Sequence, residues 1–383
     1  MPTAEGCKGR RTRLWERVRQ TPGGETVRAI LITDPRHLVY LADYYPTPFT
    51  FRSHGQTAAL LLQADGAAIL FADSNCRVFA DEAHVDERIL FGWYDGKHSA
   101  PPRKPNFAGH LSLEVQWRLG DATVGVEAST LPTLFCDRLT GQKFDVEPIL
   151  HAMKRNKDPD EIAILRKSME AGVAGYLAAR EHVEPGMNEL QAYLIIAETC
   201  QLQAGTPAIV YGDFVSGPRT ITGGGPPTDR VIEPGDLLLL DFSVVLREYR
   251  GDFAGTFAVQ WKATDEQHRA HDAAMRAMET GESMLRPGAP CAEIDRAVRA
   301  SLASAGYGDA FKSHVGHGLG LGHPDPPYIV PESTDHLEIG DVVTLEPGVF
   351  LPNQFGLRVE RNYLITESGF ENLTLHPLTI DGA

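Results

Sequence analysis

The segment Ile232-Glu-Pro-Gly-Asp-Leu-Leu-Leu-Leu-Asp241 decides the fold, because a second segment of the same design follows it: Leu337-Glu-Ile-Gly-Asp-Val-Val-Thr-Leu-Glu346. Each begins with an acidic, glycine-containing turn, continues as an apolar run of strand length and ends on a carboxylate. When the two are aligned on their Gly-Asp steps, Asp241 coincides with Glu346. The repeat predicts two half-domains of similar design, each of which delivers an acidic side chain to the same place.

A second acidic residue follows each of these two carboxylates. After Asp241, the sequence predicts a strand, a polar turn at 247–250 and a return strand over 252–260, which places Asp252 beside Asp241 across a hairpin. After Glu346, the chain returns to Glu360 in the same way. Four buried carboxylates repel one another and need a counter-charge, for which metal ions are the usual source.

A histidine in a glycine-rich loop lies between the two acidic pairs. The loop reads Gly316-His-Gly-Leu-Gly-Leu-Gly-His323, and its glycines allow backbone or a ligand to approach the imidazole of His317 closely. A single aspartate at the end of a strand is usually a turn residue, and a single histidine usually packs in the core or lies on the surface. Two matched acidic pairs around this loop favour a metal site instead.

The length and charge of the chain restrict its organisation and its partners. A chain of 383 residues is long enough for two domains. The net charge of −15, with no basic run, predicts that neither nucleic acid nor a membrane is a partner. The sequence contains no apolar run of about 18 residues, so no membrane span is predicted. No apolar signal-peptide core follows the basic N-terminus, so no signal peptide is predicted. Five scattered cysteines predict free thiols in a reducing cytoplasm.

A domain boundary is predicted at 155–158. Residues 1–155 alternate helical and strand-like patterns, which is typical of an α/β domain with a mixed sheet, and a Pro-, Lys- and Gly-rich loop is predicted over 95–105. Asp158-Pro-Asp-Glu161 predicts a helix start with an N-cap, a proline and a capping-box glutamate. From there on, a helix pair followed by a hairpin occurs twice. The strands predicted in the first domain are 26–33, 57–62, 67–71 and 124–127.

Taken together, these residues resemble the signature of the pita-bread dinuclear metallopeptidases, which include Xaa-Pro aminopeptidases, prolidases, methionine aminopeptidases and the creatinase fold. The resemblance rests on the ten residues between Asp241 and Asp252, on Gly-His317-Gly-Leu-Gly, on Thr-Leu-Glu346-Pro-Gly and on Gly-Leu-Arg-Val-Glu360. It implies an α+β pita-bread catalytic domain with a pseudo-twofold repeat over residues 156–383. An α/β domain before it, here over residues 1–155, is typical of the proline-peptidase and creatinase branch.

The resemblance also implies a metal centre with two divalent ions. Asp252 and Glu360 would bridge both ions, Asp241 would bind one, and His317 with Glu346 would bind the other. Manganese is the expected metal, with cobalt, zinc and iron as alternatives, because carboxylates with one imidazole suit these ions. A water between the ions becomes hydroxide-like near neutral pH and attacks the scissile carbonyl. The family resemblance further implies a homodimer.

Several positions depart from the family pattern. His323 arrives one residue earlier than the usual second histidine, and Pro324 stands at the expected place. A loop adjustment that restores His323 to its role would make it the group that stabilises the oxyanion, while Glu346 transfers protons. Gly224 stands where the family often has a histidine that faces the substrate. Ala254 stands where a threonine that supports the ligands is common.

Two further residues are predicted to contact the substrate. His314 lies three residues before His317, whereas the extra histidine of the family usually lies four before. Arg358, and also Arg219, is a candidate partner of a substrate carboxylate. For both arginines, a structural salt bridge to a neighbouring acid is the alternative interpretation.

The expected function is that of an Xaa-Pro aminopeptidase or Xaa-Pro dipeptidase, which removes the residue before proline from a small peptide. One alternative is an enzyme of the same fold that acts on a non-peptide amide, an amidine or another small metabolite, which Gly224 and the shifted His323 favour. The other alternative is a non-catalytic binding module, which the complete set of five metal ligands disfavours.

Overall fold

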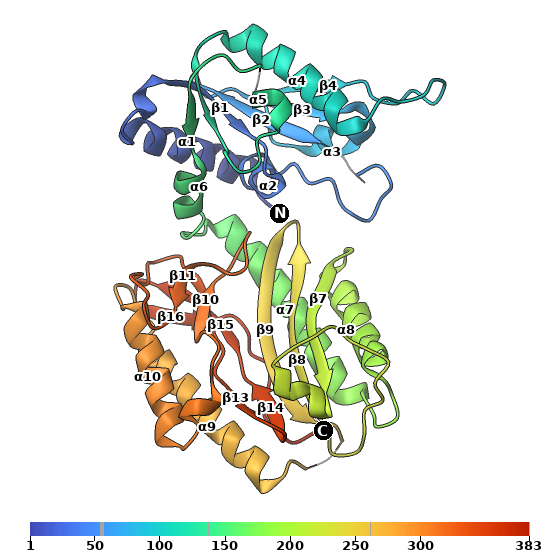
Figure 1. Cartoon of the computed structure of the whole chain (residues 1–383), viewed down its shortest axis with the longest axis vertical. Coiled ribbons are helices and arrows are strands. Elements are labelled where there is room, and N and C mark those ends of the chain that lie inside the picture. Colours follow the sequence, from blue (N-terminus) through green and yellow to red (C-terminus); the bar gives the residue numbers. More distant parts are fainter. Residues whose placement is uncertain (54–56, 137, 261, 383) are drawn as a thin grey trace. The chain divides into compact units, whose positions relative to one another are not determined.

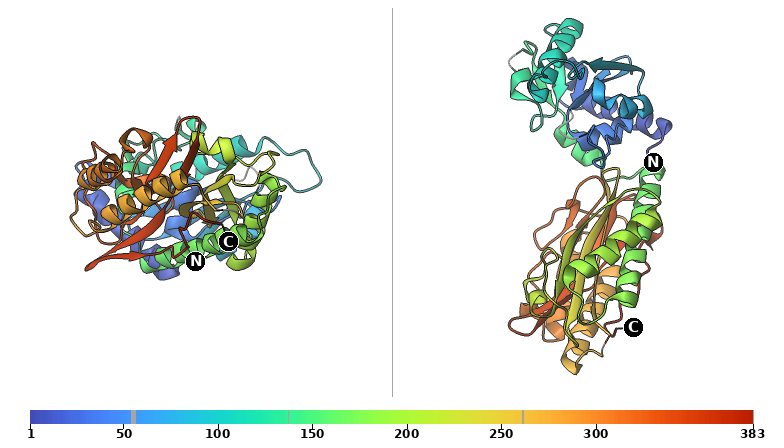
Figure 2. Two further views of the ribbon diagram at one scale, coloured as in Figure 1. Left: turned by 90° about the horizontal axis from the view of Figure 1, so that it is seen from below. Right: turned by 90° about the vertical axis from the view of Figure 1, so that its right-hand side faces the viewer.

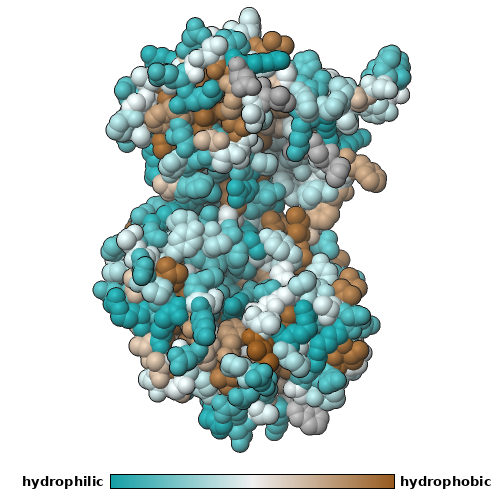
Figure 3. Space-filling model, viewed as in Figure 1, coloured by the Kyte–Doolittle hydropathy of each residue, from teal (hydrophilic) through white to brown (hydrophobic). Residues whose placement is uncertain are grey.

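The computed structural model of the protein describes residues 1–53, 57–136, 138–260 and 262–382. The chain forms two compact units, Met1–Lys154 and Arg155–Ala383 (Figure 1). This division lies one residue before the boundary expected from the sequence. Figure 3 shows hydrophilic side chains over most of the viewed face, with apolar residues exposed singly or in small groups. No helix in the described part of the chain combines the length and apolar character that a membrane span requires.

The first unit contains a six-stranded mixed sheet in the order β4-β3-β2-β1-β5-β6. β1 runs antiparallel to β2 and parallel to β5. β3 is buried from its first residue to its last, which explains why it reads as an almost continuous apolar run. The elements are α1 (Ala4–Gln20), β1 (Val27–Ile32), α2 (Pro35–Ala42), β2 (Ala58–Gln63), β3 (Ala68–Asp73), α3 (Arg77–Glu82), β4 (Glu87–Phe91), α4 (Arg103–Leu119), β5 (Thr123–Val126), α5 (Thr133–Cys136), β6 (Lys143–Asp145) and α6 (Glu147–Met153).

The loop predicted over 95–105 ends earlier than expected, because α4 already begins at Arg103. Arg103 forms an ion pair of 2.6 Å with the buried Asp73, and its guanidinium lies 4.6 Å from the centre of the Trp93 ring. These contacts fix the start of the helix. Pro105 lies in the first turn, where the missing N–H has no helical partner to lose.

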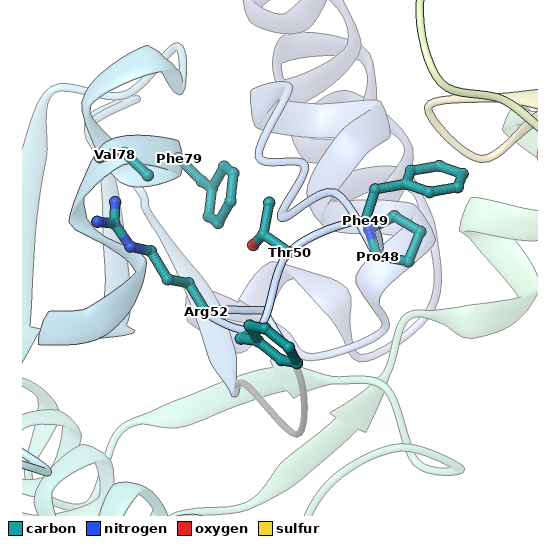
Figure 4. A pocket seen from close by; sticks show the side chains of 7 residues that line it. Pro48, Phe49, Thr50, Arg52, Val78 and Phe79 are labelled. Atoms are coloured by element: carbon teal, nitrogen blue, oxygen red, sulfur yellow. The ribbon is translucent and has the colours of Figure 1, made fainter. Parts of the chain in front are cut away.

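A hollow of about 760 Å³ opens on the surface of the first unit. Figure 4 shows Pro48, Phe49, Thr50 and Arg52 on one loop, with Val78 and Phe79 on α3. The hollow lies within this unit and contains none of the predicted metal ligands.

The first half of the second unit is a helix pair on a three-stranded antiparallel sheet in the order β7-β8-β9. Asp158 and Glu161 form the predicted capping box at the start of α7. The predicted hairpin is confirmed, but its turn has only two residues, Arg247 and Glu248, both with positive φ, so that β9 begins at Tyr249. Figure 2 shows the two helices along one side of these strands. The elements are α7 (Pro159–His182), α8 (Glu189–Ala204), β7 (Ile209–Ser216), β8 (Leu237–Leu246) and β9 (Tyr249–Ala258).

The second half repeats this plan, as the sequence predicts. A helix pair and a large apolar core support a five-stranded sheet in the order β11-β10-β12-β15-β16, with a separate hairpin of β13 and β14. The elements are α9 (Asp265–Glu282), α10 (Cys291–Ser304), β10 (Gly316–Gly318), β11 (Asp325–Ile329), β12 (Val342–Leu345), β13 (Gly348–Leu351), β14 (Phe355–Arg358), β15 (Arg361–Thr366) and β16 (Gly369–Asn372).

The two halves meet along β9 and the segment between β14 and β15. The hydroxyl of Thr256 accepts from the Arg358 N–H and donates to the Arg358 carbonyl, at 3.0 Å each. The Glu360 N–H donates to the Ala254 carbonyl at 3.0 Å, and the Asn362 amide donates to the Asp252 carbonyl. This seam carries the acidic residues of the two halves to one place.

Candidate metal centre

The alternation of side chains along the strands decides which residues face the site. Phe214 of β7 lies against Tyr193 of α8 and stacks on Phe242 of β8, which in turn lies against Phe253 of β9. These rings therefore face the helices. Residues next to them in the strands point to the other face of the sheet, and these include Asp241 and Asp252.

The hairpin register makes the two aspartates diagonal neighbours. Asp241 pairs with Ala254, and Asp252 pairs with Ser243. The Ser243 hydroxyl donates to Asp252 Oδ1 at 2.8 Å and itself accepts from Arg250 Nε at 2.6 Å. The sequence predicted the two aspartates side by side, and the structure places both on the same face of the sheet.

The five predicted ligands lie close together, and their role as metal ligands stays a prediction. Within the described residues, Asp241, Glu346 and Glu360 offer one oxygen each within 4.8 Å of one another, and so do Asp252, His317 and His323 with one atom each. In a third group, one ligand atom each of His314, His317 and Glu346 lie within the same 4.8 Å of one another. Glu346 belongs to the first and third of these groups, and His317 belongs to the second and third. The three groups therefore form one continuous cluster.

His317 has the tautomer that a metal ligand needs. Its Nδ1 lies 2.9 Å from the carbonyl of Gly318, to which it donates, so that Nε2 is the bare nitrogen. Nε2 lies 3.5 Å from Glu346 Oε1 and 3.9 Å from Asp252 Oδ2. Burial lowers the pKa of His317, which favours the neutral ring.

His323 reaches the cluster despite its shift by one position. Its Nε2 lies 2.5 Å from Asp252 Oδ2, and its ring centre lies 4.6 Å from that of His317. Burial opposes ionisation of Asp252, but the hydrogen bond and the charge of His323 outweigh it and lower the pKa of Asp252 to about 2. Pro324 has not displaced His323 from the site.

His314 and Arg358 also contact the acids. His314 Nε2 lies 3.0 Å from Glu346 Oε1, and this hydrogen bond raises the pKa of His314. The Arg358 guanidinium pairs with Asp241 and lies 3.8 Å from Glu346 Oε2. The alternative interpretation of Arg358, an ion pair with a neighbouring acid, is therefore the one seen here, and its contact with a substrate stays a prediction.

Arg219 already has an acidic partner within the protein. It forms an ion pair with Glu189, which is fully buried on α8. Glu189 also accepts from the backbone and hydroxyl of Ser216 and of Thr228 at 2.7–3.0 Å. Arg219 thus belongs to a structural network that ties α8 to the loop after β7.

The acids of the cluster differ in how well they are compensated. Burial raises the pKa of Asp241 to about 7, although Arg358 counteracts it. Burial also raises the pKa of Glu360 well above its ordinary value, and the charges of Asp252, Glu346 and Asp241 add to the rise. Oε1 of Glu360 is buried and has no hydrogen-bond partner among the described residues. A divalent cation would satisfy this oxygen and relieve the repulsion, so the residues fit a metal site.

Sequence reasoning missed one acidic residue at the site, Asp213. It lies directly opposite Asp241 in the pairing of β7 with β8, so both side chains project from the same face. The sequence pattern that could have indicated Asp213 was weak, because its strand also contains a glycine and a tyrosine and lacks the long apolar run that precedes Asp241 and Glu346.

Comparisons with known proteins agree with this geometry. Residues 163–367 match the profile of metallopeptidase family M24, and residues 15–153 match the creatinase/prolidase N-terminal domain. The chain belongs to metallopeptidase family M24. Its pita-bread fold is shared by an X-Pro aminopeptidase from Thermotoga maritima, at a TM-score of 0.81 and 22% identity over 96% of this chain and 99% of that one. A Xaa-Pro dipeptidase from Bacillus anthracis superposes with a TM-score of 0.82 at 23% identity, over 97% and 99% of the two chains.

Curated relatives of this M24 protein include peptidases from staphylococci. An uncharacterized peptidase from Staphylococcus saprophyticus is 24% identical over 371 residues, which cover 94% of this chain and 98% of the relative. Another, from Staphylococcus aureus, is 26% identical over 360 residues, which cover 90% and 94% of the two chains. The match spans both units, so the family membership concerns the chain as a whole.

Replacement of Glu360 by Gln should stabilise the protein after metal removal with EDTA. The raised pKa means that the folded state holds a proton that the unfolded state releases above about pH 4.5, so stability falls as the pH rises through this range. Glu360→Gln should increase the free energy of unfolding by about 1–3 kcal/mol at neutral pH, with no gain below about pH 4. Urea unfolding followed by circular dichroism measures this, with Glu367→Gln on the surface as control. An equal or lower stability of Glu360→Gln at neutral pH would contradict the assignment.

Proposed function

We propose that this metallopeptidase is an Xaa-Pro exopeptidase, an aminopeptidase or a dipeptidase, that cleaves the first residue from short peptides with proline in second position. The observation that carries the proposal is the convergence of four carboxylates and His317 in one cluster, in which Oε1 of Glu360 is buried and has no hydrogen-bond partner among the described residues. The proteins of like fold from Thermotoga maritima and Bacillus anthracis support the choice of substrate, since both are described as acting on X-Pro or Xaa-Pro peptides.

We further propose that five residues hold two divalent ions, with manganese as the preferred metal. These are Asp241, Asp252, His317, Glu346 and Glu360, and their carboxylate-rich set suits manganese, cobalt, iron or zinc. When bound, the ions polarise the scissile carbonyl and lower the pKa of a water molecule so that it becomes a nucleophile near neutral pH.

We assign the proton transfer to Glu346. Peptide hydrolysis adds a water oxygen to the carbonyl carbon, breaks the bond from that carbon to the proline nitrogen, and carries a proton from the water to this nitrogen. The Glu346 carboxylate lies within reach of both His314 and His317. Burial would raise the pKa of Glu346, but the hydrogen bond from His314 and the charge of Arg358 outweigh it and lower this pKa, so that the carboxylate can accept the proton.

His323 is placed to stabilise the developing oxyanion. Its ring lies against Asp252 and is partly exposed, in contrast to that of His317. A donor that is held by Asp252 and still open to the substrate side can hydrogen-bond the carbonyl oxygen as negative charge builds on it. The contact of His323 with Asp252 supports this proposed role, even though His323 comes one residue earlier than usual.

A hollow beside the cluster provides room for the substrate. It has a volume of about 400 Å³, and its lining includes Thr222, Gly223, Lys312, Phe350 and Arg358. The flat aromatic side chain of Phe350 suits a proline ring. The second unit therefore combines an apolar wall with polar groups next to the acids.

Turnover of Xaa-Pro peptides after metal exchange tests the proposal. Protein stripped with EDTA should be inactive, and Mn²⁺ should restore cleavage of Ala-Pro and of Ala-Pro-Ala, whose relative rates separate dipeptidase from aminopeptidase. Ala-Ala, which lacks the proline ring, should be cleaved at least about tenfold more slowly. Metal-dependent cleavage of Ala-Ala at the same rate as Ala-Pro would remove the proline specificity. No cleavage with any ion would contradict the peptidase assignment.

Replacement of His323 by Ala should lower kcat by about 10²–10³-fold, because one oxyanion donor is lost. The metal content, measured by inductively coupled plasma mass spectrometry, should be unchanged. His98→Ala, which removes an exposed histidine of the first unit, serves as control and should keep full activity. Full activity of His323→Ala would exclude its role, and loss of metal would instead make it a ligand.

A further inference from the structure

Asp213 lies at the edge of the metal cluster and takes no part in the proposed reaction. β7 is the outer strand of its sheet, so Asp213 is next to Asp241 on the side away from β9. Neighbouring strands are about 4.8 Å apart. Asp213 is therefore one strand further out than Asp241, and it belongs to none of the groups of close ligand atoms found among the described residues.

The Asp213 carboxylate has no cationic partner, in contrast to its neighbours. Its Oδ1 accepts a hydrogen bond of 2.8 Å from the Gly225 N–H. In the described part of the chain, no side-chain nitrogen of Lys, Arg or His lies close enough to the Asp213 carboxylate to form an ion pair, for which the N···O limit is 4.0 Å. By contrast, Asp241 is paired with Arg358, and Asp252 with His323.

The backbone of the glycine loop 223–225 lies against the Asp213 carboxylate. A Cβ atom on Gly224 would fall 2.2 Å from Asp213 Oδ2 and 2.5 Å from its Cγ. The carboxylate thus occupies the space that a side chain at 224 would need. Because Gly223 and Gly225 also lack side chains, the loop provides Asp213 with a backbone donor and with no charge.

The proposed substrate has one group that can reach Asp213. The α-amino group is attached to the carbon next to the scissile carbonyl and therefore lies close to the central cluster. Proline, in second position, carries no side-chain charge. A long side chain of the first residue can extend one strand further, to Asp213.

We propose that Asp213 is a specificity-determining residue, which selects substrates whose first residue carries a cationic side chain, Arg or Lys. This inference rests on the proposed Xaa-Pro exopeptidase function. A half-buried carboxylate that is already fixed by a backbone N–H and lacks a cation of its own is a suitable partner for a guanidinium or ammonium group. This ion pair would favour binding of substrates with a cationic first residue, and it would not involve the scissile bond or the residues that cleave it.

Paired peptides that differ only in this charge test the proposal. Citrulline-Pro has nearly the shape of Arg-Pro without the positive charge. With Mn²⁺-loaded protein, kcat/KM for Arg-Pro should exceed that for citrulline-Pro about tenfold, and Asp213→Asn should reduce this ratio to about one, mainly through KM for Arg-Pro. Asp213→Glu, which retains the charge, should keep a ratio above one. Glu332→Gln, which removes an exposed acid elsewhere in the unit, should leave the ratio unchanged.

The outcomes separate this inference from the function on which it rests. If Arg-Pro and citrulline-Pro are cleaved equally well by the unmodified protein, the cationic subsite is wrong and the peptidase proposal stands. If Asp213→Asn loses bound manganese, Asp213 is a metal ligand and the subsite is also wrong. If neither peptide nor Ala-Pro is cleaved, the Xaa-Pro function fails and the subsite fails with it.

Discussion

Repulsion between buried carboxylates is the constraint on which the second unit depends. Asp241, Glu346 and Glu360 bring oxygens within 4.8 Å of one another in the protein interior, where water cannot screen their charges. Arg358, His314 and His323 compensate three of the acids, and the oxygen of Glu360 has no partner among the described residues. A bound cation would offset the repulsion and the desolvation of these carboxylates. This compensation is the physical basis of the proposed metal centre.

The backbone brings this cluster together by repetition. In each half, a helix pair supports a sheet, and an apolar strand leads to an acid. The ladder in the first half fixes Asp241 and Asp252 on one face, since Phe242 and Phe253 must point toward the helices. The seam from Thr256 to Arg358 and from Ala254 to Glu360 then sets the second half against the first. Packing of apolar residues thereby dictates where the charged residues lie.

Much of this could be predicted from the sequence, because the relevant patterns are local. The apolar run before Asp241 and its repeat before Glu346, the cap at Asp158 and the glycines around His317 are all read without knowledge of the tertiary structure. The start of α4 and the tight turn after β8 could not be predicted, because Arg103 is fixed by a distant aspartate and the turn uses two non-glycine residues with positive φ. Asp213 was missed for a related reason: a partner strand places it opposite Asp241, and its carboxylate fits against Gly224 because residue 224 has no side chain, and no local pattern records either contact.

We propose that these side chains converge because they hold divalent cations. X-ray diffraction from a crystal grown with Mn²⁺, recorded at the manganese absorption edge, would locate such ions. We expect two anomalous peaks per chain, surrounded by the side chains of Asp241, Asp252, His317, Glu346 and Glu360. A map without anomalous density at these residues, with Arg358 still paired with Asp241, would contradict this proposal.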